Sequence, residues 1–162
     1  MACAGALSAC WVQVDVGGNN VPLLSGQTAT IGDVIYKMDV RTDSGVNFNL
    51  YAKGAGSTKP TFSYEDMSKF TVSIKSKETG EYYFQDQPLD DVEPFGDCGD
   101  YDAIFRGYLY WSTMVTKNRA LLDGYKEGDQ IQITYTDASE KKITWTLPTA
   151  VQSASLPPYW NG

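Results

Sequence analysis

The residues most able to do chemistry lie in one acidic stretch, residues 86–102. This stretch carries no Lys or Arg, and its seven carboxylates belong to Asp86, Asp90, Asp91, Glu93, Asp97, Asp100 and Asp102. Ca²⁺ prefers about six to eight oxygen ligands from a flexible loop. The best candidate ligands are therefore Asp97, Asp100 and Asp102, which have Gly96 and Gly99 beside them for tight turns. Their spacing differs from an EF-hand loop, and the alternative is a solvated acidic loop or one that faces a basic patch on a neighbour.

Other catalytic chemistry is poorly supported by the composition. The chain has no His, which removes Ser-His-Asp and Cys-His catalysis, HExxH zinc sites and Cys2His2 fingers. Paired acids could serve a glycosidase, but no feature of the sequence singles out such a pair. There is no G-x-S-x-G elbow and no glycine-rich phosphate loop. We therefore predict a protein that is not an enzyme and has no cofactor apart from the calcium candidate.

Aromatic side chains offer a second kind of chemistry, because 13% of the residues are aromatic and 11 of them are Tyr. A Tyr or Trp ring has a flat apolar face and a polar tip, which suits both sugar stacking and protein interfaces. The candidates for such a sheet face are Tyr82, Tyr83, Tyr108, Tyr110 and Trp111. For a protein interface we predict Trp11, Tyr108, Tyr110, Trp111, Tyr159 and Trp160. The alternative is that these rings pack in the core or across strands.

Strands must position these side chains, because alternation of apolar and polar residues dominates the chain. It predicts a strand over residues 11–16, hairpins over 34–50, 70–85 and 128–147, and an aromatic strand over 101–111. Residues 86–100 are expected to form a long loop. A helical turn is expected over residues 63–69 with Ser63 as its N-cap, and a helix over residues 117–123 that ends at Gly124.

The spacing of about eight or nine short strands, with a turn signal every 8–12 residues or so, is typical of an antiparallel sandwich or barrel. We predict an all-β fold with minor α content: an antiparallel β-sandwich, immunoglobulin-like or jelly-roll-like, with one or two short helices and extended termini. Residues 128–147 resemble the last hairpin of many immunoglobulin-like modules, a likeness that implies no function. The expected organisation is an N-terminal arm (1–10), a sandwich domain (11–148) and an extended C-terminal tail (149–162).

The cysteines and the N-terminal arm give little functional signal. Cys3 and Cys10 could close a small disulfide loop, whereas Cys98 lies far away beside acids that disfavour a reactive thiolate. The stretch Leu7-Ser8-Ala9-Cys10 resembles a bacterial lipobox, but only nine residues precede Cys10, so a lipobox would require a further segment upstream. We interpret this stretch as an arm that leads into the first strand.

The formal net charge of −7 argues against binding to a nucleic-acid backbone, and no apolar run is long enough for a membrane span. We predict a structural subunit of a larger assembly that docks through its termini and sheet edges. It would be a virion component, such as a capsid decoration, tail or fibre-attachment protein, or a surface filament subunit. Its partners would be copies of itself or other subunits, in a virion or at the cell surface. The alternative is a carbohydrate- or receptor-binding sandwich, with or without a structural calcium ion.

Overall fold

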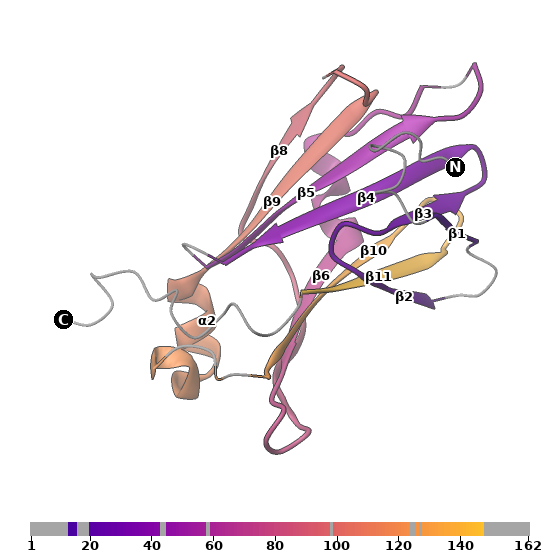
Figure 1. The fold of residues 1–162 in the computed structure, drawn as a ribbon. Helices are drawn as coiled ribbons and strands as arrows, with labels where there is room; N and C mark the ends of the chain where they lie inside the picture. Colours follow the sequence, from indigo (N-terminus) through magenta and orange to yellow (C-terminus); the bar gives the residue numbers. More distant parts are fainter. Residues whose placement is uncertain are drawn as a thin grey trace.

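The computed structural model describes residues 13–15, 20–42, 45–57, 59–97, 99–123, 126 and 128–147. Within them the strands form two sheets that face each other (Figure 1). The larger sheet has the order β1 (Gln13–Asp15), β3 (Thr28–Ile31), β4 (Val34–Arg41), β5 (Gly45–Gly54), β9 (Ala103–Tyr110), β8 (Asp91–Phe95). The smaller sheet has the order β2 (Asn20–Leu24), β11 (Lys142–Leu147), β10 (Gln130–Thr136), β6 (Phe70–Lys75), β7 (Tyr82–Gln87).

This arrangement confirms the predicted all-β, sandwich-like fold with mostly antiparallel pairs. The three predicted hairpins are present as β4–β5, β6–β7 and β10–β11. Two pairings are parallel, because β1 lies beside β3 in the larger sheet and β2 lies beside β11 in the smaller one. The first two strands thus belong to different sheets. The finer assignment to an immunoglobulin-like or jelly-roll type stays a prediction, as do the domain limits.

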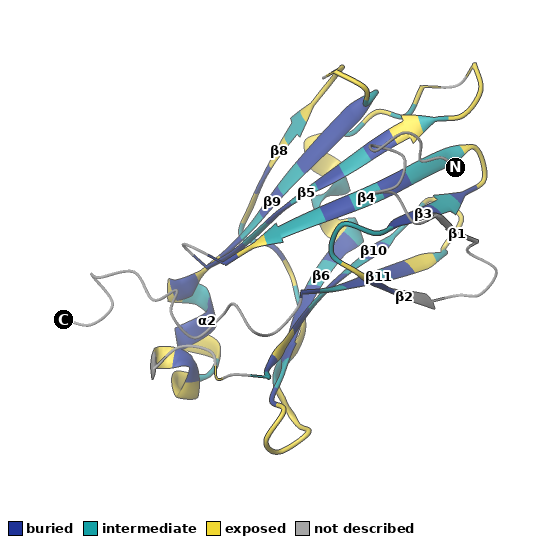
Figure 2. Cartoon of the chain, in the orientation of Figure 1, coloured by how far each residue is buried: buried dark blue, intermediate teal, exposed yellow. Residues whose placement is uncertain are grey.

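Aromatic rings fill the space between the sheets. Phe70 of β6 stacks on Phe105 of β9 with ring centroids 4.8 Å apart, and it lies 5.2 Å from Phe48 of β5. Buried and less buried residues alternate along β4, β5 and β10 (Figure 2). The alternation that the sequence shows is therefore that of strands with one face in the core. Burying a ring of this size is worth about 1.5–3 kcal/mol.

The helical segments are short, and one of them corrects a prediction. The turn η1 (Tyr64–Lys69) begins after Ser63 as expected, and the Asp66 carboxylate accepts a hydrogen bond of 2.8 Å from the Ser63 N–H. The predicted helix over residues 117–123 is displaced, because α2 (Trp111–Lys117) ends where it should begin and η2 (Arg119–Asp123) is a 3-10 turn. Helix α2 buries Trp111, Met114 and Val115, which have the spacing of one helix face.

The predicted long loop over residues 86–100 is also wrong in part, because β8 lies within it and pairs with β9. Val92 is buried, whereas Asp91 and Glu93 on either side are exposed. The strand alternates correctly, but its acids and Pro94 are typical of loops. Such residues are tolerated here because β8 is the last strand of the larger sheet, where one side needs no ladder partner.

Candidate binding surface

The outer face of the larger sheet is the surface on which candidate binding residues gather. We use outer face for the residues of β4, β5, β9 and β8 that alternate with the core residues. Strand register sets them in three rows, namely Lys37–Tyr51–Ile104–Phe95, Asp39–Asn49–Arg106–Glu93 and Arg41–Asn47–Tyr108–Asp91. Neighbours in a row are close enough for their side chains to interact. Tyr110 extends the face at the end of β9.

Arg106 ties the middle of this face together. Its Nε donates to Asn49 Oδ1 at 3.0 Å, and its guanidinium lies 5.2 Å from the centre of the Phe95 ring. Glu93 Oε1 is 3.9 Å from a terminal guanidinium nitrogen and accepts a 2.7 Å hydrogen bond from the Tyr108 hydroxyl. Three strands therefore hold one polar and aromatic network, although each single pair at the surface contributes little stability.

Tyr108 and Tyr110 form a pair of nearly parallel rings beside that network, which we call the platform. Their rings are 6.3 Å apart and inclined by only 25°. The Tyr110 hydroxyl donates to Asp91 Oδ2 at 3.3 Å, so both hydroxyls point to carboxylates of β8. Partial burial raises the pKa of both phenols, helped by Glu93 at Tyr108 and by Asp91 at Tyr110. Both are therefore neutral hydrogen-bond donors near neutral pH.

A second aromatic group occupies the other end of the outer face. The rings of Tyr51 and Tyr101 are 4.7 Å apart, and the Lys37 ammonium lies 5.1 Å and 5.8 Å from their centres. Burial, and next the charge of Tyr51, raises the pKa of Tyr101 to about 12. The sequence analysis did not single out Tyr51 or Tyr101. The signal was available for Tyr51, because Phe48 and Leu50 alternate along the predicted strand and the next residue must lie on its opposite face.

Only part of the predicted interface lies on this face. Tyr108 and Tyr110 do, and 42% of Tyr110 is exposed. Trp111 does not, because it is 1% exposed and belongs to the core, the alternative already considered for it. Trp11, Tyr159 and Trp160 lie outside the described residues.

The other two aromatic candidates belong to the smaller sheet. Tyr82 on β7 is exposed, and the Lys75 ammonium lies 5.6 Å from its ring centre. The Tyr83 hydroxyl instead donates to the buried Asp129 carboxylate at 3.0 Å. These two side chains therefore do not join the aromatic groups of the outer face.

The predicted calcium ligands are not brought together. Asp102 Oδ2 accepts a 2.7 Å hydrogen bond from the Gly54 N–H, which fixes the end of β5. Asp97 and Asp100 are exposed. Across the described residues, no three carboxylate or thiol side chains are placed to hold a metal ion. The partner of Asp102 lies on a strand far away in the chain, so the sequence alone could not indicate this structural role.

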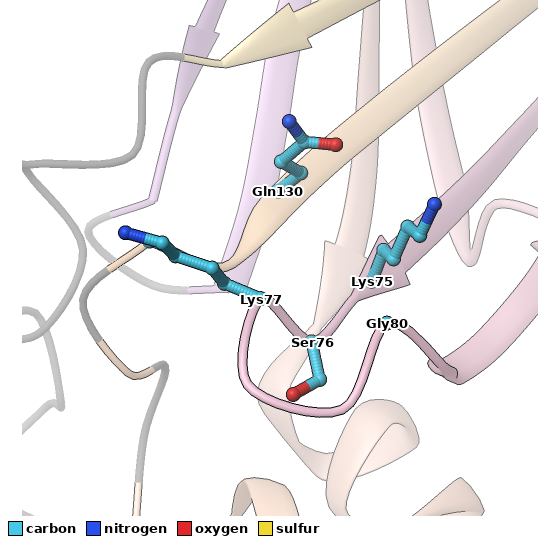
Figure 3. Close-up of a pocket in the computed structure, with 6 residues that line it drawn as sticks. Lys75, Ser76, Lys77, Gly80 and Gln130 are labelled. Carbon is cyan, nitrogen blue, oxygen red and sulfur yellow. The ribbon is translucent and has the colours of Figure 1, made fainter.

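Two hollows lie away from the outer face. The smaller, of about 280 Å³, is lined by Lys75, Ser76, Lys77, Gly80, Gly128 and Gln130. Its two lysine side chains point in different directions (Figure 3), so they do not converge on one anion. The larger, of about 540 Å³, lies at one end of the sandwich between the β3–β4 turn, residues 60–62, η1 and the β10–β11 turn. We call it the end groove.

Comparison with known protein families, with curated proteins and with solved structures finds no match. Among the described residues there is no helix long and apolar enough to cross a membrane. Inferences about function therefore rest on the geometry above.

Proposed function

We propose that this chain is a non-enzymatic structural subunit of a larger assembly, either a virion component or a surface filament subunit. The observation that carries the proposal is the outer face, where Tyr108, Tyr110 and Arg106 stand together on a rigid sheet. Tyr and Arg are the residue types that most often dominate binding at protein interfaces. A sheet also holds them with little loss of freedom on binding, because cross-strand hydrogen bonds already orient them.

The charge around the platform indicates what kind of partner it fits. Asp90, Asp91 and Glu93 flank the two tyrosines, and the whole chain carries a formal charge of −7. Within this corner of the face the three carboxylates outnumber the guanidinium of Arg106, so two copies of the corner would repel each other. A partner surface rich in Arg and Lys would instead be attracted, and Arg side chains could stack on the Tyr rings. We therefore assign the outer face to a basic protein component of the assembly.

Docking on this face is favoured over strand addition at the β7 and β8 edges, which are two of the four sheet edges in the described part of the chain. The β8 edge carries Pro94 between exposed acidic and aromatic residues. In β7 the register shifts twice against β6, and Asp86 has a positive φ of 54°. Such irregular edges discourage pairing with another strand.

A pair of variants tests the role of the outer face. We would express the tagged chain in its natural source and separate large assemblies from free protein by gradient sedimentation. The wild type should co-sediment with the assembly, and the Tyr108→Ser/Tyr110→Ser variant should remain with free protein. Tyr64→Ser is the matched control, because Tyr64 is 67% exposed on η1. If the wild type never sediments, or the double variant sediments equally, the proposal is wrong.

One observation favours a second candidate function, carbohydrate binding. Nearly parallel Tyr rings at 6.3 Å, with carboxylates beside them, also suit stacking against pyranose rings. A glycan array separates the two functions. The second function is supported if the array shows sugar binding that does not change with salt concentration. The Tyr108→Ser/Tyr110→Ser variant should then lose that binding. A silent array would leave the first. Adding EDTA in the same experiments tests whether calcium takes part.

A further inference from the structure

The end groove has the composition of a site for an extended, uncharged peptide. Its floor contains Tyr36, Phe62 and Tyr135, and Phe62 meets Tyr135 edge to face with centroids 6.5 Å apart. Pro60 and Val34 add apolar surface. Aromatic-lined grooves of this kind accept proline-rich segments, because such segments are already extended before they bind.

Hydrogen bonding in the floor fits the same occupant. The hydroxyls of Tyr36 and Tyr135 hydrogen-bond to each other, which uses one of their two protons. A pair of phenols joined in this way can donate its second proton to an acceptor on a bound segment. A proline-rich backbone presents carbonyl acceptors while its prolines lack the N–H donor. One donor in an aromatic floor therefore matches the chemistry of such a backbone.

The rim of the groove favours an occupant without charge. Asp66 is paired with Lys69 at 3.0 Å and also accepts the Ser63 N–H. Asp137 Oδ1 accepts the N–H groups of Ser139 and Lys141, both at 2.9 Å. The rim thus carries two carboxylates, Asp66 and Asp137, and two ammonium groups, those of Lys69 and Lys141, so it has no net charge that would favour a charged occupant.

The chain itself contains a segment of this type outside the described residues. Residues 156–160 read Leu-Pro-Pro-Tyr-Trp, and residues 148–162 include no charged side chain. The segment would therefore not suffer the repulsion that a net charge of −7 imposes on two copies of the sandwich.

The direction of β11 indicates which copy supplies the segment. β11 begins next to the β10–β11 turn that lines the groove and ends at Leu147, five residues further on, about 17 Å away. Residues 156–160 would have to turn back along β11 to reach the groove of their own copy. The groove of a neighbour in a head-to-tail arrangement requires no such reversal.

We propose that the end groove is the docking site for residues 156–160 of a second copy of the chain. The proposal deepens the assembly role by naming one contact between copies, and it rests on that role. It would join copies head to tail, which gives rings or open filaments.

Photo-crosslinking of the full chain tests the proposal. Benzoylphenylalanine replaces Trp160, and the products are separated by mass and mapped. We expect a crosslink at dimer mass, growing with protein concentration, to residues 60–69 or 135–141. Crosslinks at monomer mass would overturn the assignment to a second copy. Crosslinks that map elsewhere, or none, would overturn the groove as the site.

Matched variants keep the test independent of folding. Thr61→Arg and Ser139→Arg place a bulky side chain at exposed lining positions and should reduce the crosslink yield at least about tenfold. Ser68→Arg, on the exposed part of η1 outside the groove lining, should leave the yield unchanged. An equal yield in all three would count against the proposal. The Tyr108→Ser/Tyr110→Ser variant should keep the crosslink, so failure here and failure of the outer-face role are distinguishable.

Discussion

The Asp129 carboxylate ties the start of β10 to the β6–β7 hairpin, which is about 50 residues earlier in the chain. It is 1% exposed and accepts hydrogen bonds from the Lys77 N–H at 3.1 Å, the Lys126 N–H at 2.9 Å and the Tyr83 hydroxyl at 3.0 Å. Several hydrogen bonds offset the cost of removing this carboxylate from water. Without the carboxylate, the buried donors would have no acceptor. This residue therefore anchors the turn that leads into β10.

We predict that Asp129→Ala lowers the free energy of unfolding by about 2–4 kcal/mol, since three donors lose a charged acceptor. Urea denaturation measures the change. Asp33→Ala, at an exposed position, should shift the free energy by less than about 0.5 kcal/mol. Equal effects of the two substitutions would show that the Asp129 contacts do not stabilise the fold.

Gly107 is required for close packing rather than for backbone freedom. It lies opposite Phe48 in the ladder, and an added Cβ would overlap the Phe48 ring and press on Leu89. We predict that Gly107→Ala costs about 1–3 kcal/mol of stability because the core must shift. In Gly56→Ala the new methyl would meet open space, so this control should be nearly neutral. Thermal melting of both variants checks the difference, and matching melting temperatures would contradict it.

Tyr101 makes the stability of the fold sensitive to alkaline pH. Its pKa is raised to about 12, so the folded state favours the neutral phenol. The stabilisation of the folded state by the neutral Tyr101 phenol is fully present below the unfolded pKa of about 10. It is lost as the pH rises through the folded pKa of about 12. We predict that the free energy of unfolding falls between pH 10 and 12. Tyr101→Phe should make that fall shallower, and the exposed control Tyr64→Phe should not.

At the scale of elements, the β8 edge is protected by its sequence. Pro94 has no N–H, and the strand is only five residues long. We predict that Pro94→Thr restores a regular edge and increases self-association, seen as a higher apparent mass in light scattering as concentration rises. Pro88→Thr, in the exposed connection before β8, should not change the mass. If both variants stay as small as the wild type, Pro94 has no protective role.

The elements that sequence reasoning found are those with local signals. The hairpin β4–β5 has clean alternation, and η1 has a cap at Ser63. By contrast, β8 was missed because its acids and proline resemble a loop until β9 is known to lie beside it. The start of α2 was missed as well, because Trp111 continues the alternation of β9 and was assigned to the preceding strand. Tertiary neighbours decided both cases, and they leave no mark in a short window of sequence.

For the whole molecule, charge should govern association. The acidic residues beside Tyr108 and Tyr110 would attract a basic partner. Salt screens this attraction, and the screening length is about 8 Å at physiological ionic strength. We predict that raising the salt concentration from about 0.1 M to 0.5 M releases the chain from its assembly, as measured by the gradient sedimentation described above. Retention in high salt would indicate that apolar contacts dominate instead.

The candidate site was predictable in part at this scale. Alternation along residues 101–111 identified Tyr108 and Tyr110 and put both on one face, as the structure does. Their carboxylate partners could not be foreseen, because Asp91 and Glu93 were assigned to a loop. The end groove was not foreseen either, since it is assembled from four segments that only the finished fold places together.

The parallel pairing of β2 with β11 has a mechanical consequence. Five residue pairs join these strands, from Asn20 with Lys142 to Leu24 with Thr146. Tension applied between the start of β2 and the end of β11 pulls the strands along their own length in opposite directions. The hydrogen bonds between the two strands would then be loaded in shear and would have to break together, rather than one after another. A subunit anchored by its two ends would thus resist stretching through this pair of strands.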